Sequence, residues 1–156
     1  FTILEGPLAG HKASVKLADD GKSYLSPEIL HTSASFLIYS KKNQTLTLDI
    51  NGAKTDYLIT MNDEKPIPNG KYDLEIPYEP HHRHGEPYES FSLFAKTWFR
   101  IGHTGDRYLH LGEFSDGCVT VRAGENHPGA WDEIYHRLIV SRMGDSMNVG
   151  TLLVVD

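Results

Sequence analysis

Cysteine is nearly absent from this sequence, since Cys118 is the only one among 156 residues. An internal disulfide is therefore excluded, and cysteine usage does not identify the compartment. No apolar run approaches the ~20 residues needed to cross a bilayer, so no membrane span is expected. Basic residues are also few: 15 Lys and Arg against 21 Asp and Glu leave a formal net charge of −6. This balance argues against nucleic acid as the main partner.

The length and composition are those of one globular domain, with 39% hydrophobic and 23% charged residues. The chain begins at Phe1 rather than Met, which is compatible with a removed signal peptide, leader or delivery domain, and equally with a trimmed chain. Residues 1–33 carry weak periodicity and several turn formers, so we expect an N-terminal arm or leader junction there. Residues 34–156 are the expected main domain.

The pattern from residue 34 onward predicts mainly β structure. An apolar run at Phe36–Tyr39 is followed by strict alternation over Thr45–Ile50, which places Leu46, Leu48 and Ile50 on one face of a strand. Asn51-Gly52 is a hairpin turn signal, and Asp56–Met61 is the expected returning strand. These segments predict an antiparallel meander of three strands.

Further strands are expected at Phe91–Phe94, Thr97–Ile101, Tyr108–Leu111, Val119–Val121 and Thr151–Val155, and a turn feeding a strand at Lys65–Leu74. Apolar residues at helical spacing between Trp131 and Ile139 predict an amphipathic helix that ends at Gly144. The expected fold class is mainly β: a mixed β-sheet or sandwich of about eight to ten strands with one main C-terminal helix.

A proline-rich segment, Pro77–Glu89, is predicted to be a loop without regular structure. It holds His81, His82 and His84 close to Glu86, a set that permits either a zinc site or a lid over a cleft. We favour the lid, and we expect no metal site and no cofactor.

Chemistry concentrates between Ile101 and Arg122, where Cys118 follows the turn Ser115-Asp116-Gly117 and two histidines, His103 and His110, lie upstream. A thiol acts as a nucleophile in its thiolate form, and an imidazole can take its proton. Gly117 allows close approach of the backbone, so the amides of Gly117 and Cys118 are candidate donors to an oxyanion. The alternative is that Cys118 is a small buried hydrophobe.

The block His103-Thr104-Gly105 followed by Ser115-x-Gly117-Cys118 resembles the signature of L,D-transpeptidase catalytic domains. The resemblance implies a cysteine acyl-enzyme that acts on peptidoglycan stem peptides, as transpeptidase or carboxypeptidase. It implies Cys118 as nucleophile, Gly117 and Ser115 in the oxyanion turn, and His103 as base. We favour His103 over His110 because His103 follows a strand and precedes Thr-Gly. His110 is expected in the core or behind the site, and it is a candidate substrate-binding residue.

The sequence departs from the family pattern at two positions: Asp116 stands where the family has His, and Thr120 stands where it has Arg. Arg122 comes two residues later on the same strand face, so it is expected to bind substrate as the family's Arg does. Asp116 is a candidate partner for a substrate ammonium group, and Trp98 is expected in the core or the groove wall with a candidate substrate contact.

The implied location is the bacterial envelope, periplasmic or secreted, and a toxin delivered against a rival's cell wall is one setting for a specialised member. Two other classes stay open. One is a cysteine hydrolase or amidase on a non-peptidoglycan substrate, and the other is a non-catalytic cell-wall-binding module.

Overall fold

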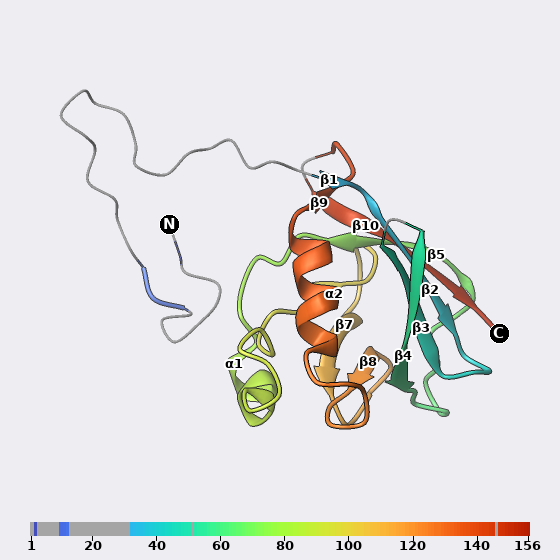
Figure 1. The fold of residues 1–156 in the computed structure, drawn as a ribbon, viewed down its shortest axis with the longest axis horizontal. Coiled ribbons are helices and arrows are strands. Elements are labelled where there is room, and N and C mark those ends of the chain that lie inside the picture. The colour runs from blue at the N-terminus through green and yellow to red at the C-terminus, as the bar shows by residue number, and fades with distance from the viewer. Residues whose placement is uncertain (1, 3–9, 13–31, 51, 146) are drawn as a thin grey trace.

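A computed structural model describes residues 2, 10–12, 32–50, 52–145 and 147–156. The described part of the chain contains ten strands, one main helix and two short helical turns (Figure 1). The strands are β1 Thr32–Ser33, β2 Ser35–Ser40, β3 Thr45–Ile50, β4 Ala53–Thr60, β5 Gly70–Glu75, β6 Phe99–Arg100, β7 Tyr108–Gly112, β8 Val119–Arg122, β9 Ser141–Arg142 and β10 Asn148–Val155. The helical segments are α1 His82–Gly85, η1 Glu86–Tyr88 and α2 Ala130–Ile139.

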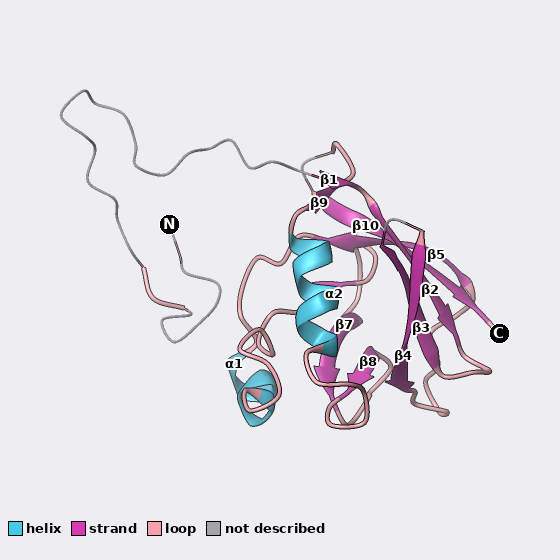
Figure 2. Cartoon of the chain, viewed as in Figure 1, coloured by secondary structure: helices cyan, strands magenta, loops and turns pink. Residues whose placement is uncertain are grey.

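Eight of the strands form one mixed sheet in the order β5-β10-β2-β3-β4-β8-β7-β6, and β1 pairs with β9 separately. The pairs β2–β10 and β7–β8 are parallel, and the other pairs of the large sheet are antiparallel. The expected fold class, mainly β with one main C-terminal helix, is confirmed. Figure 2 shows α2 lying beside the strands.

The two ends of the large sheet meet. Leu74 of β5 forms an antiparallel bridge with Ile101, the residue after β6, and the Gly102 N–H donates to the Asp73 carbonyl at 2.8 Å. Strand twist allows a sheet of this size to curl until its edges pair, which removes exposed edge hydrogen-bonding groups. The closure places the residues after Ile101 directly against β5.

The predicted meander is confirmed: β2, β3 and β4 are consecutive antiparallel neighbours. Alternation along β3 turns Leu46 and Leu48 fully into the core, where they face Tyr39 and Leu37 of β2 in register. Fully burying a Leu side chain contributes about 2 kcal/mol, so this register is strongly specified. A slip by one residue would turn these side chains to solvent.

The amphipathic helix is confirmed with a shorter span. Its buried residues are Ala130, Trp131, Ile134, Tyr135 and Leu138. The prediction that it ends at Gly144 is wrong, because the chain leaves the helix after Ile139 and forms β9, a strand that was not predicted. The buried Ser141 hydroxyl is 2.7 Å from the Ser35 hydroxyl, so pairing with residues distant in sequence competes with the last helical turn.

Two predictions between residues 77 and 94 are wrong. Pro77–Glu89 is not devoid of regular structure, since it contains α1 and η1. A proline is tolerated in the first turn of a helix because its missing N–H has no partner there, and Pro87 occupies that place in η1. Phe91–Phe94 is a turn rather than a strand: the Ser92 hydroxyl accepts from the Phe94 N–H at 3.0 Å.

The expected strand Thr97–Ile101 is reduced to β6, Phe99–Arg100. Most of the expected arm, 1–33, lies outside the described residues; of the remainder, Thr2 and Lys12 form an antiparallel bridge and β1 pairs with β9. No helix in the described residues is long and apolar enough to cross a membrane.

Candidate functional site

Cys118 lies on a tight turn immediately before β8. Gly117 has φ of 96°, a backbone conformation that residues with a side chain rarely adopt. A Cβ atom at Gly117 would lie 3.0 Å from a guanidinium nitrogen of Arg107 and 3.2 Å from the Lys65 carbonyl oxygen. The positive φ favours glycine before the cysteine, and any other side chain would also require these neighbours to shift slightly.

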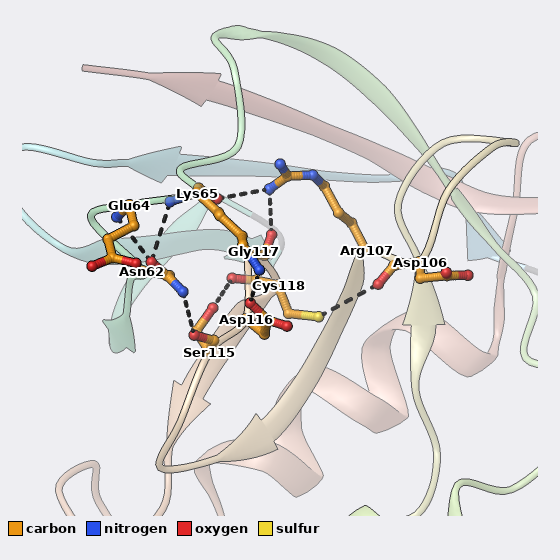
Figure 3. A network of polar contacts seen from close by, with 9 residues as sticks. All are labelled: Asn62, Glu64, Lys65, Asp106, Arg107, Ser115, Asp116, Gly117 and Cys118. Carbon is orange, nitrogen blue, oxygen red and sulfur yellow. Dashed lines mark hydrogen bonds and ion pairs between the residues drawn. The ribbon is translucent and has the colours of Figure 1, made fainter.

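A network of polar contacts holds this turn (Figure 3). The Ser115 hydroxyl donates to the Cys118 carbonyl at 2.7 Å, and the Asn62 side-chain amide donates to the Ser115 carbonyl at 3.1 Å. Lys65 Nζ lies 2.8 Å from the exposed Asp116 carboxylate, and this contact lowers the pKa of Asp116. The Ser115 side chain thus stabilises the turn by bonding to its backbone, and Asp116 is paired with Lys65.

The sulfur of Cys118 faces the backbone of residues 106–108. Sγ lies 3.8 Å from the Asp106 carbonyl oxygen, which accepts from the thiol. Burial raises the pKa of Cys118, and the Tyr108 N–H and the charge of Arg107 act in the opposite direction. Since burial is the largest cause, the thiol of the free protein is protonated at neutral pH.

The parallel pairing of β7 with β8 brings His110 to the same face as Cys118. His110 pairs in register with Thr120, and Thr120 and Cys118 are two residues apart, so their side chains share a face. His110 Nε2 lies 3.0 Å from the Thr120 hydroxyl oxygen, and Nδ1 lies 2.9 Å from the Leu111 carbonyl oxygen. Because a carbonyl oxygen only accepts, Nδ1 carries the proton and Nε2 presents its lone pair.

Aromatic rings cover the rest of His110. Trp98 stacks on its ring with centroids 4.0 Å apart, and His81 in turn stacks on Trp98 with centroids 4.3 Å apart. His110 is only 6% exposed, and this burial lowers the pKa of His110 to about 4. His110 is therefore a neutral base of fixed tautomer near pH 7.

A pocket of about 390 Å³ contains both groups. Its lining residues are His84, Tyr88, Trp98, His110, Gly112, Phe114, Ser115, Asp116 and Cys118. The structure thus brings together five of the sequence-predicted site residues, with Gly117 between two of them. His84 and Tyr88 come from α1 and η1, so the histidine-rich segment forms one wall of this pocket.

His103 lies elsewhere, at the closure between β5 and β6. Its Nδ1 is 2.8 Å from a Glu75 carboxylate oxygen and its Nε2 is 3.2 Å from one of Asp73. These two hydrogen bonds raise the pKa of the exposed His103. The lining of the Cys118 pocket does not include His103, and both ring nitrogens already face carboxylates.

Arg122 is also engaged away from Cys118. Its guanidinium donates to the Ile59 carbonyl at 3.0 Å and to the Gln44 side chain at 2.6 Å, and it pairs with Glu125 at 3.0 Å. It lines a different pocket, of about 330 Å³, next to the start of α2. The Asn126 side chain there is likewise bonded to backbone groups of the protein, which leaves few polar groups to recognise a ligand.

Sequence reasoning did not identify Arg107, Asn62 or Thr120 as site residues. Arg107 and Asn62 contact the turn from 10 and 53 residues away, and no local spacing relates them to it. Thr120 had one signal, since it lies two residues after Cys118 on the same strand face.

The fold and the pocket together define the class: a closed mainly-β domain with a buried neutral histidine on β7 and a cysteine on the turn before the parallel neighbour, β8. This is the fold of the L,D-transpeptidases. An L,D-transpeptidase from Stackebrandtia nassauensis matches 85% of this chain and 61% of its own with a TM-score of 0.52 and 13% sequence identity. L,D-transpeptidase 1 of Mycobacterium tuberculosis matches 79% of this chain and 62% of its own, with a TM-score of 0.48 and 17% identity.

The chain therefore spans about three-fifths of the length of these solved structures. No protein-family model matches the sequence, and no curated protein matches it. The resemblance seen in the sequence is confirmed as a likeness of fold.

Proposed function

We propose that this protein is a cysteine acyltransferase that acts on peptidoglycan stem peptides, as an L,D-transpeptidase or an L,D-carboxypeptidase. The observation that carries the proposal is the shared pocket of Cys118 and His110, in which a thiol and a neutral imidazole line one cavity. The fold of an L,D-transpeptidase supports this substrate class over other acyl donors.

His110 is the proposed base, in place of His103. It lines the pocket of the nucleophile, and the lone pair of its Nε2 faces the Thr120 hydroxyl, which is 3.0 Å away. His103 would first have to leave two carboxylates that favour its charged form. The choice between the two histidines is decided by the variants described below.

Thr120 is suited to serve both protonation states of His110. Its hydroxyl oxygen lies 3.0 Å from His110 Nε2 and 3.3 Å from the Phe114 carbonyl oxygen. When His110 is neutral, the hydroxyl donates to Nε2. When Nε2 has taken a proton, it donates to the hydroxyl oxygen, which then donates to the Phe114 carbonyl. The imidazolium is thereby hydrogen-bonded at both nitrogens.

The reaction then proceeds in two steps, acylation of Cys118 and opening of the resulting thioester. The Thr120 hydroxyl turns to the Phe114 carbonyl and releases Nε2 of His110. The proton of Cys118 moves to that nitrogen, and sulfur bonds to the carbonyl carbon between the third residue and the D-residue at position four of a stem peptide. The amides of Gly117 and Cys118 stabilise the oxyanion. The C–N bond breaks, and terminal D-Ala leaves with the proton from His110. An amine of a second stem, or water, then attacks the thioester and gives its proton to His110; the C–S bond breaks, the Cys118 thiolate leaves and regains that proton, and the product is a cross-link or a tripeptide.

The remaining pocket residues bind substrate in this proposal. Trp98 forms part of the wall, the segment with His84 and Tyr88 acts as a lid, and Asp116 exchanges Lys65 for a substrate ammonium group. Arg122 has no assigned contact with substrate because its guanidinium is bonded elsewhere. The proposed place of action is the bacterial envelope, where stem peptides are found, and a delivered antibacterial toxin is one form of that proposal.

The test is mass spectrometry of purified muropeptides after incubation with the protein and with Cys118→Ala. Cys118-dependent dimers or exchange of D-Ala establish a transpeptidase, and conversion of tetrapeptide to tripeptide alone establishes a carboxypeptidase. If no muropeptide product depends on Cys118, the proposal is refuted. Products in an assay of other amides then favour a different hydrolase, and cosedimentation with intact cell walls then favours a binding module.

Two histidine variants identify the base. His110→Ala is expected to lower turnover on the order of 10²–10⁴-fold, as loss of a general base does, whereas His103→Ala retains turnover close to that of the wild type. His103 is an appropriate matched control because it is an exposed histidine outside the pocket. The reverse result would assign the base to His103.

A further inference from the structure

Arg107 contacts the turn formed by residues 115–118, which presents Cys118. It lies in the segment between β6 and β7, and its Nη1 donates to the Gly117 carbonyl at 2.5 Å and to the Lys65 carbonyl at 3.2 Å (Figure 3). One nitrogen thus joins the turn to the chain that precedes β5. Its neighbours Asp106 and Tyr108 face the sulfur of Cys118, so the segment reaches both the turn and the thiol.

The bond to Gly117 determines how the next amide points. In a trans peptide the C=O of Gly117 and the N–H of Cys118 lie in one rigid plane and point in opposite directions. The Gly117 oxygen is held toward Arg107, so the Cys118 N–H points away from it.

The charge of Arg107 also favours the thiolate of Cys118, as the Tyr108 N–H does. Burial and the carboxylates of Asp106 and Asp116 raise the pKa of Cys118, whereas the charge of Arg107 lowers it. Lys65, the other cation at this turn, is already paired with Asp116. Arginine keeps its charge at all working pH values and binds carbonyl oxygens with a planar fork.

We propose that Arg107 is a positioning residue: it orients the Gly117–Cys118 peptide so that the Cys118 N–H meets the oxyanion, and its charge stabilises the thiolate. The role as oxyanion guide rests on the function proposed above. The effect on the thiolate does not, because it concerns the free protein.

The test is the rate at which iodoacetamide alkylates Cys118, the only cysteine, between about pH 5 and about pH 9. Arg107→Gln keeps a hydrogen-bond donor without the charge, and Arg107→Lys keeps the charge. The matched control is Arg100→Gln, because Arg100 donates to the Gly105 carbonyl at 3.0 and 2.7 Å and so holds the same segment at a different point. Arg107→Met is the second uncharged variant if Arg107→Gln fails to fold.

The uncharged variants are expected to shift the alkylation profile to higher pH and to lower the rate at neutral pH on the order of tenfold. Arg107→Lys and Arg100→Gln are expected to retain the wild-type profile. An unchanged profile in the uncharged variants, or an equal shift in Arg107→Lys, overturns the proposal. On muropeptides the uncharged variants should lower kcat with little change in KM.

The two readouts separate this inference from the proposed function. Alkylation needs no peptidoglycan, so a shifted profile without muropeptide products leaves the role of Arg107 in place and refutes the substrate class. Muropeptide products with no shift of the alkylation profile in any Arg107 variant support the substrate class and refute the role of Arg107.

Discussion

Acidification is expected to lower the free energy of unfolding through protonation of His110. The ordinary pKa of histidine, 6.5, is lowered to about 4 in the folded protein because His110 is buried. The unfolded chain keeps the ordinary value, so between these two pH values it binds more protons than the folded chain. The free energy of unfolding therefore falls as the pH drops from about 6.5 to about 4. The gap between the two pKa values corresponds to about 3 kcal/mol, and a side chain that is 6% exposed needs no large correction for solvent screening.

The measurement is urea unfolding of the wild type and of His110→Gln at about pH 7 and at about pH 4, analysed as a two-state transition. Glutamine does not titrate, so the wild type is expected to lose about 3 kcal/mol more than the variant over this interval. His103→Gln is the control with the opposite sign. The pKa of His103 is raised, so its contribution is present below the unfolded pKa and is lost as the pH rises through the folded one. Equal losses in the wild type and His110→Gln would refute the reasoning.

Three further predictions concern the pocket and the turn. Phe114 is 80% exposed and lines the pocket, so Phe114→Ala should raise KM several-fold and leave the unfolding free energy within about 0.5 kcal/mol; Leu93→Ala, 63% exposed and outside the lining, should change neither, and an equal KM effect contradicts the contact. Gly117→Ala should destabilise the protein by about 1–3 kcal/mol in urea unfolding and slow alkylation of the thiol; a variant as stable as the wild type shows that the turn tolerates a side chain. Trp98→Ala hydrates one face of His110, so the pKa of that ring, followed by NMR titration, should rise above about 4; a pKa that stays in place excludes the stack as its cause.

Much of the fold could be predicted because its signals are local. The alternation of Thr45–Ile50 and the turn after it specify a hairpin whatever the rest of the chain does, and helical spacing specifies the buried face of α2. Predictions failed where a distant contact decides. The Ser141 hydroxyl contacts that of Ser35, which is 106 residues away in the chain. Phe91–Phe94 forms a turn around the Ser92 hydroxyl, although its aromatic residues have β propensity.

The sequence by itself identified the candidate nucleophile and the turn that presents it, because Ser115, Gly117 and Cys118 are neighbours in the chain and Cys118 is the only thiol. Only the tertiary structure decided which basic groups surround that thiol. Closure of the sheet joins His103 to Asp73 and Glu75, and the parallel register of β7 and β8 sets His110 on the face of Cys118. Proton transfer depends on distance and burial in space, and sequence separation measures neither.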